Sequence, residues 1–436
     1  MTPEVSIGAH RMGRRQWIAI TIGVFLNGLD GFDAASISFA AADLSRDWQL
    51  SPDALGWVLS MELIGMAAGS MIFGLLADLR GRRICILLCL GLMTTGMLVA
   101  AYAGSVVELS LARIVAGLGI GGMLAALTAL VSEYANDRWR ALVVSTMIIG
   151  YPVGTVFGGL VARQLLADGD WRSVFLFGAG MTLAALPCAL AFLPESPIWL
   201  GRSNKLGAAE RANAILLLFG LPPARTFPPS AARVAFPFAA LFQGDLARTT
   251  ILLTAAYVGH MACYYFVFKW LPKLVVDMGH HPQAGADILI VAMLAGAAAG
   301  PIFGLLSSRL TLHRTAIGVL VGAAVAVNVF GQIGSSFLAL AFAAVLVGGF
   351  LNGGGVAFYA LLAAALPAHL RGSGLGFGIG VGRAGAAFGP AIAGSMFSSG
   401  QTLPATAAIM SIGPLMAAIA IIVANKSRPN QSTTRA

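Results

Sequence analysis

The chain has 436 residues, of which 58% are hydrophobic and only 10% are charged. Soluble globular proteins usually carry about 25% charged residues, so most of this chain cannot face water. Its formal net charge of +9 would suit nucleic-acid binding, but the positions of the charges exclude that interpretation.

Apolar stretches of about 20 residues are long enough to cross a bilayer. Such stretches predict twelve transmembrane helices, near residues 17–42, 56–77, 84–103, 108–131, 141–163, 171–193, 249–272, 284–306, 314–333, 337–362, 371–397 and 402–424. With the N-terminus in the cytoplasm, 20 of the 27 Lys and Arg residues fall on the cytoplasmic side and only four on the opposite side. Because this is the bias of the positive-inside rule, we expect both termini to be cytoplasmic and explain the basicity by topology.

The predicted fold class is therefore all-α and integral to the membrane, with two pseudo-symmetric six-helix bundles. The bundles are predicted at residues 17–193 and 249–424, with cytoplasmic tails at 1–16 and 425–436. The polar, proline-rich stretch 194–248 is predicted to be a cytoplasmic linker with little packed core.

The first predicted helix carries two acids, Asp30 and Asp33. Residues three apart share a helix face. A carboxylate at membrane depth is costly and normally marks an ion path or a proton relay. These acids are the predicted proton-coupling residues; the alternative is a structural pair bonded to neighbouring backbone.

The loop after the second helix combines tight turns with opposite charges. Gly74 and Gly81 bracket Asp78, and Arg82 and Arg83 follow. Such charges can pair with one another and with helix dipoles, and so latch one conformation. The alternative is an ordinary positive-inside loop.

Two arginines lie within predicted helices, and each can hold a substrate carboxylate bidentately. The alternative for Arg113 is to tie helices together through Glu62 or Glu108. Arg383 has no obvious acidic neighbour in its own half, which favours contact with a substrate or a gate.

The seventh predicted helix adds further substrate-binding candidates. His260 can bond a ring hydroxyl or pass a proton, or it can simply pack between helices. Tyr264 and Phe268 share a helix face and are predicted to sandwich an aromatic ring, although membrane aromatics more often pack or mark the interface. Lys269 is expected near the outer helix end, either reaching the interface or attracting anions.

The two halves of the chain resemble each other at a constant offset. The sequence at 72–76 recurs unchanged at 302–306, and Arg140 and Gly154 reappear as Arg371 and Gly385. Duplicated halves place a substrate cavity between them, opened alternately to each side.

The loop at 74–83 resembles the signature loop of the major facilitator superfamily, except at Leu79, where a basic residue is usual. Segments 113–121, 150–159 and 194–200 resemble motifs of its fourth, fifth and sixth helices. At 307–309 the second copy of the loop has lost its acid, which implies a weaker C-terminal latch.

Within that superfamily, the chain is most similar to the aromatic acid:proton symporter branch. The similarity rests on Asp30-Gly31-Phe32-Asp33, on Ser132-Glu133-Tyr134 with the following Arg140, and on 380–390. The resemblance implies that Glu133 and Arg140 join the latch. It also implies import of benzoate-type acids with protons across a bacterial inner membrane.

The expected function is thus proton-coupled import of a small aromatic carboxylate such as 4-hydroxybenzoate. Proton-driven export and import of another organic anion, such as a muconate-type dicarboxylate, remain alternatives, as does a membrane sensor. The expected partners are the substrate, the proton and the lipid bilayer. A monomer suffices, and no cofactor, metal, nucleic acid or enzymatic reaction is expected.

Overall fold

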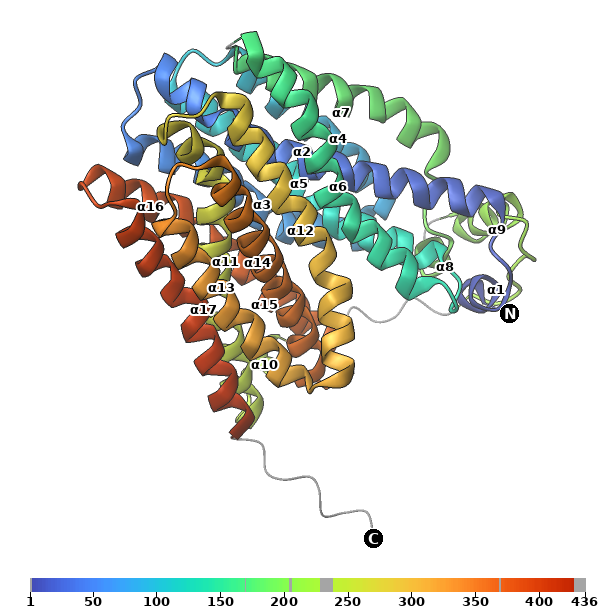
Figure 1. Ribbon diagram of the computed structural model, residues 1–436. Coiled ribbons are helices and arrows are strands. Elements are labelled where there is room, and N and C mark those ends of the chain that lie inside the picture. The colour runs from blue at the N-terminus through green and yellow to red at the C-terminus, as the bar shows by residue number, and fades with distance from the viewer. Residues whose placement is uncertain (1, 169, 204–205, 228–237, 368–369, 427–436) are drawn as a thin grey trace. The chain divides into compact units, whose positions relative to one another are not determined.

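The computed structural model describes residues 2–168, 170–203, 206–227, 238–367 and 370–426, and these contain helices but no β-strand. The long helices are α2 (Arg14–Asp47), α3 (Pro52–Arg80), α4 (Arg82–Tyr102), α5 (Val106–Tyr134), α6 (Arg140–Leu165), α7 (Arg172–Phe192), α11 (Gly244–Asp277), α12 (Pro282–Arg309), α13 (Leu312–Gln332), α14 (Phe337–Ala365) and α17 (Leu403–Lys426). The shorter helices are α1 (Pro3–Ala9), α8 (Pro197–Gly201), α9 (Ala208–Leu218), α10 (Phe238–Leu241), α15 (Arg371–Ala386) and α16 (Phe388–Ser398), with a 3-10 turn, η1 (Leu166–Asp168). Figure 1 shows their course along the chain.

Within the described part of the chain, eleven helices are long and apolar enough to cross a membrane. The prediction of an all-α membrane protein is confirmed. The remaining predicted helix, 371–397, is broken at Ala387 into α15 and α16. Pro390 has no backbone N–H to offer the carbonyl four residues earlier, at Ala386, which is the last residue of α15. Seven of the sixteen residues of α15 are glycine, which further weakens the helix there.

The internal repeat extends to the helix bounds. Helices α2 and α11 both have 34 residues and begin 230 positions apart. Helices α4 and α13 both have 21 residues, again offset by 230, and α5 and α14 both have 29 residues, offset by 231. Matching lengths in three helix pairs support a duplicated architecture.

The predicted linker contains more structure than its composition suggested. Helices α8 and α9 share a small apolar cluster of Leu200, Ala208 and Ala212. Helix α1 packs beside them (Figure 1), and its Ser6 hydroxyl donates a 2.7 Å hydrogen bond to the carbonyl of Pro222. The N-terminal segment is therefore anchored to the loop region.

The chain divides into two compact units. Unit 1 comprises Met1–Ser36, Ile64–Gly158 and Arg172–Val234, and unit 2 comprises Ile37–Leu63, Gly159–Trp171 and Ala235–Ala436. Helices α2, α3 and α6 contribute residues to both units. The units are therefore not simple N- and C-terminal halves.

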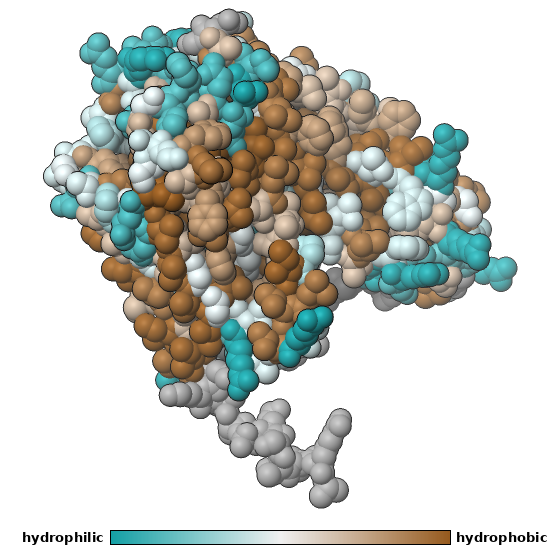
Figure 2. All heavy atoms as spheres, in the orientation of Figure 1, coloured by the Kyte–Doolittle hydropathy of each residue, from teal (hydrophilic) through white to brown (hydrophobic). Residues whose placement is uncertain are grey.

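The sides of the long helices are apolar. Figure 2 shows hydrophobic residues along them and hydrophilic residues gathered towards helix ends. Large side chains such as Phe157, Leu305 and Phe342 are 60–67% exposed, on helices that qualify as membrane spans. In a bilayer these side chains would face lipid rather than water.

Within unit 1, α2 and α6 approach closely through glycines. A methyl group on Gly154 would lie 1.9 Å from the carbonyl oxygen of Gly28, and one on Gly31 would lie 1.9 Å from that of Tyr151. Small residues permit this backbone-to-backbone contact in membrane helices. The contact holds the acid-bearing part of α2 against α6.

Candidate functional site

The acid pair of α2 is buried in unit 1. Asp30 and Asp33 are 1% and 0% exposed. Arg113 on α5 is also fully buried, and its guanidinium donates a 2.9 Å hydrogen bond to the backbone carbonyl of Asp33. The same guanidinium lies 3.1 Å from the Met97 sulfur on α4 and 5.5 Å from the Phe175 ring centre on α7. Unit 1 thus brings both predicted proton-coupling residues together with one predicted substrate-binding cation.

Of the two acids considered for Arg113, Glu108 has a different role in the structure. Its carboxylate accepts a 2.8 Å hydrogen bond from the Gly104 amide, and its own amide donates to the Ser105 hydroxyl. This pattern caps the start of α5. Arg113 itself contacts three other helices, which is the geometry of a tie between helices.

The predicted aromatic pair of α11 lies in unit 2. The ring centres of Tyr264 and Phe268 are 4.4 Å apart, so the two rings touch and no third ring lies between them. Residues four apart on a helix are direct neighbours, which is why these rings pack on each other. The Tyr264 hydroxyl donates to the Asn352 side-chain oxygen at 3.3 Å. In the structure the two rings therefore do not form a sandwich around a third ring. A binding role for the two residues stays a prediction.

His260 is fully buried within the same unit. Its Nε2 donates to the backbone carbonyl of Leu351 at 3.0 Å, and its ring lies 5.7 Å from that of Phe358. Gly354 leaves room for the imidazole, since a methyl group there would lie 2.3 Å from it. These contacts are those of a helix-packing histidine.

Arg383 on α15 belongs to a cluster of tyrosines that the sequence analysis did not single out. The hydroxyls of Tyr257 and Tyr265 lie within electrostatic range of its guanidinium. The rings of Tyr257 and Tyr359 also pack edge to face, with ring centres 6.5 Å apart. The eight-residue spacing of Tyr257 and Tyr265 on α11, about two turns, is a signal that could have revealed their common face.

Lys269 differs from its expected position at the interface. It is 3% exposed, and its ammonium group lies 3.0 Å from the carboxylate of Glu62 on α3, which is 0% exposed. Glu62 also lies within electrostatic range of Tyr265. Unit 2 therefore contains a fully buried ion pair next to the tyrosine cluster.

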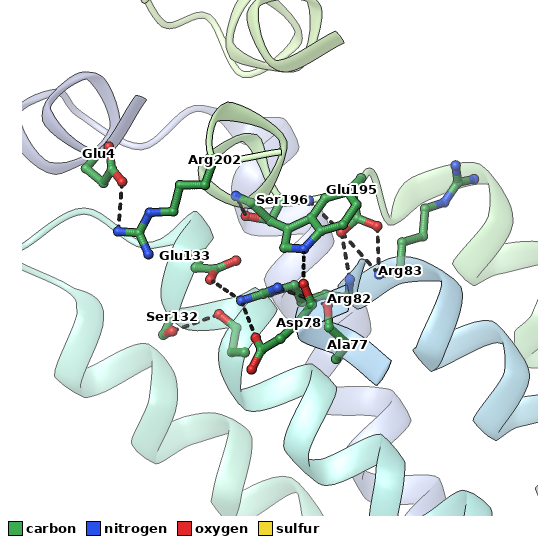
Figure 3. Close-up of polar contacts among 12 residues, drawn as sticks. Glu4, Ala77, Asp78, Arg82, Arg83, Ser132, Glu133, Glu195, Ser196 and Arg202 are labelled. Carbon is green, nitrogen blue, oxygen red and sulfur yellow. Dashed lines mark hydrogen bonds and ion pairs between the residues drawn. The ribbon is translucent and has the colours of Figure 1, made fainter. Parts of the chain in front are cut away.

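Within unit 1, Arg82 contacts two acids of the predicted latch, whereas Arg140 does not join them (Figure 3). The Arg82 guanidinium lies 3.0 Å from the Asp78 carboxylate and 3.2 Å from that of Glu133 on α5. It also donates to the Ala77 carbonyl at 2.9 Å. Arg140 pairs instead with Asp137 at 3.0 Å and donates to carbonyls near the end of α5. Gly74 has open space around it.

Glu195, which had no predicted role, completes this region. Its carboxylate accepts hydrogen bonds from the backbone amides of Arg82 and Arg83 at 3.0 and 3.2 Å, and so caps the start of α4 (Figure 3). Gly81 precedes these amides with a φ of +117°, which favours glycine, and a methyl group there would lie 2.2 Å from Glu195. Burial raises the pKa of Glu195, against the opposing effect of the amides and of Arg82.

Among the residues that the structure describes, no group of three His, Cys, Asp or Glu side chains is arranged to hold a metal ion.

Residues 20–292 match the family model described as Major Facilitator Superfamily. The chain belongs to the major facilitator superfamily. Relatives in the superfamily cover nearly the whole chain. It is 30% identical to the gallate transporter of Pseudomonas putida over 419 residues, covering 95% of this chain and 92% of the relative. It is 29% identical to the 3-(3-hydroxy-phenyl)propionate transporter of Escherichia coli, covering 93% and 94%.

A third relative is the 4-hydroxybenzoate transporter PcaK of Pseudomonas aeruginosa, 28% identical over 96% of this chain and 95% of the relative. The family assignment is confirmed, and this multi-pass membrane transporter is related to transporters of aromatic acids. It is a transporter rather than an enzyme.

Solved structures of superfamily members share the fold. A D-xylose–proton symporter superposes with a TM-score of 0.71 at 16% identity, covering 95% of this chain and 98% of that one. The inward open xylose transporter XylE of E. coli superposes with a TM-score of 0.72 at 18% identity, covering 96% and 98%. At such identities the likeness concerns the fold alone.

Proposed function

We propose that this transporter is a symporter that imports a small aromatic carboxylate, such as 4-hydroxybenzoate, together with protons by alternating access. The observation that carries the proposal is the burial of Asp30 and Asp33 beside the Arg113 guanidinium. Carboxylates at membrane depth normally serve ion paths or proton relays. The names of the three relatives described above, which are transporters of gallate, 3-(3-hydroxy-phenyl)propionate and 4-hydroxybenzoate, support the substrate class.

In the proposed cycle, a proton from outside binds Asp30 or Asp33. The substrate anion then binds near Arg383, whose neighbours Tyr257 and Tyr265 offer hydroxyl groups and apolar ring faces. The site then closes on the outer side and opens towards the cytoplasm, where the substrate and the proton are released. Cytoplasmic termini, a bacterial inner-membrane location and a monomeric state belong to the same proposal.

Uptake into proteoliposomes tests the proposal. Labelled 4-hydroxybenzoate should accumulate when an inward proton gradient is imposed, and accumulation should collapse when a protonophore is added. Alkalinisation of the outer medium on adding substrate distinguishes symport from proton-driven export, because symport removes external protons. Absence of uptake and of binding for both 4-hydroxybenzoate and gallate would reject the substrate class, and uptake of muconate instead would favour the dicarboxylate alternative.

A further inference from the structure

The buried ion pair of Glu62 and Lys269 has no function in the cycle described above. Its two groups are 3.0 Å apart, and neither is more than 3% exposed. Removing one partner of such a pair leaves a charge stranded in a low-dielectric interior, which is strongly destabilising. An anion that competes with Glu62 for Lys269 must therefore offset the loss of this pair.

The position of Lys269 makes the transported anion a suitable replacement. It follows Phe268 directly and lies one helical turn beyond Tyr265 on α11. Tyr265 lies within electrostatic range of both Glu62 and Arg383. Lys269 is thus linked to this tyrosine through its ion-pair partner Glu62, within unit 2.

Helix α3, which carries Glu62, is also held against unit 2 helices by uncharged contacts. A methyl group on Gly56 of α3 would lie 2.6 Å from the carbonyl oxygen of Pro390 on α16. The amide of Asp53 donates to the Ser398 hydroxyl at 2.8 Å. The start of α3 thereby packs on α16, the helix that follows α15 and its Arg383. The Glu62–Lys269 pair adds a charged contact between α3 and α11.

We propose that Lys269 binds the carboxylate of the substrate, and that Glu62 is the counter-ion which the substrate displaces. In the empty state Lys269 is neutralised by Glu62. When the aromatic acid binds, its carboxylate contacts the Lys269 ammonium group in place of the Glu62 carboxylate, and the charged link from α3 to α11 opens. The proton that is imported with the substrate offsets the negative charge that the substrate adds to this buried region. Lys269 is then a specificity-determining residue that couples occupancy of the site to a helix contact. This inference rests on the proposed function.

Single neutral variants at the two positions give opposite expectations for binding. In Glu62→Gln the carboxylate that competes for Lys269 is gone, so 4-hydroxybenzoate should bind about tenfold more tightly. In Lys269→Gln the binding cation is gone, so affinity should fall by about tenfold or more. A purely structural ion pair predicts that both variants weaken binding, because both disturb the same packing.

The experiment measures binding of labelled 4-hydroxybenzoate to purified protein in detergent, together with the rise in melting temperature that saturating substrate produces. Without substrate, Glu62→Gln should have a lower melting temperature than the native protein, and substrate should raise that temperature by more than it does in the native protein. In Lys269→Gln, substrate should raise the melting temperature only a little. The double variant Glu62→Gln/Lys269→Gln restores charge balance, so it should melt close to the native protein and still bind weakly. Because the double variant is expected to fold, it provides the test even if one of the single variants does not.

Lys273→Gln is the matched control. Lys273 lies one turn further along α11 and pairs with Asp277 at 2.6 Å, at the exposed end of the helix. The substrate affinity of Lys273→Gln should equal that of the native protein. Equal loss of affinity in both single variants, or unchanged affinity in the double variant, would overturn the inference while leaving the proposed function intact. Failure of the native protein to bind any aromatic acid would reject both.

Discussion

At the scale of the residue, the acid pair of α2 leads to a direct test of coupling. Asn matches Asp in size but cannot exchange a proton, so Asp33→Asn should preserve packing and abolish proton-driven accumulation of substrate. Downhill exchange of labelled for unlabelled substrate should continue, since it requires no net proton movement. Both are measured in the same proteoliposomes.

The control for this substitution is Glu210→Gln, which changes an exposed acid on α9. It should accumulate substrate like the native protein. Uphill uptake by Asp33→Asn at the native level would show that this residue does not carry the coupling proton.

Glu195 leads to a prediction about pH. Because burial raises its pKa above the ordinary value of 4.5, the folded protein binds this proton more tightly than the unfolded chain. The resulting contribution to stability is complete below pH 4.5 and is lost as pH rises through the raised pKa. The melting temperature of Glu195→Gln should therefore fall less than that of the native protein over this rise in pH.

Differential scanning fluorimetry in detergent at a series of pH values measures this difference in slope. The amide oxygen of Gln still accepts from the Arg82 and Arg83 amides, so the cap of α4 should persist. If the melting temperatures of the two proteins changed equally with pH, the raised pKa of Glu195 would be contradicted.

At the scale of the element, the contact between α2 and α6 depends on the absence of side chains. Gly154→Ala should cost about 1–3 kcal/mol of stability, because its methyl group would overlap the Gly28 carbonyl. Gly180→Ala on α7 is the matched substitution in open space, and a helix interior favours Ala by about 0.5–1 kcal/mol. Melting temperatures should therefore shift in opposite directions, and equal shifts would mean that the helices can separate at Gly154 without cost.

The helices themselves could be predicted from the sequence, because a span of apolar residues determines where a membrane helix lies. The break at Ala387 was not predicted, since the apolar composition continues through it. Its cause, the missing N–H of Pro390, is local and visible in the sequence. Pro152 in the corresponding helix α6 produces no break, so proline alone does not predict one.

At the scale of the whole molecule, the predicted topology can be tested by labelling. Ser399 follows α16 and is expected outside, whereas Leu206, which is fully exposed, is expected in the cytoplasm. A membrane-impermeant maleimide should label Ser399→Cys in intact spheroplasts and label Leu206→Cys only after permeabilisation. The native protein, whose four cysteines lie in membrane helices, is the unlabelled control. The reverse pattern would invert the topology.

Pairings between distant residues account for most of what the sequence did not predict. The acids and arginines of the site were recognised because charge in an apolar helix stands out locally. The pairing of Lys269 with Glu62 joins residues 207 positions apart, and nothing in the spacing of either indicates the other. The capping of α4 by Glu195, 113 residues from Arg82, was missed for the same reason.

The anchoring of α1 has a consequence for the order of biosynthesis. Ser6 donates to Pro222, and Asn136 donates to the carbonyl of His10, so the N-terminal segment touches parts of the chain made much later. It cannot complete these contacts until the ribosome has passed residue 222. The segment around α1 is thus among the last parts of unit 1 to complete its contacts. A bulky group attached to this segment would interfere with late assembly rather than with insertion of α2.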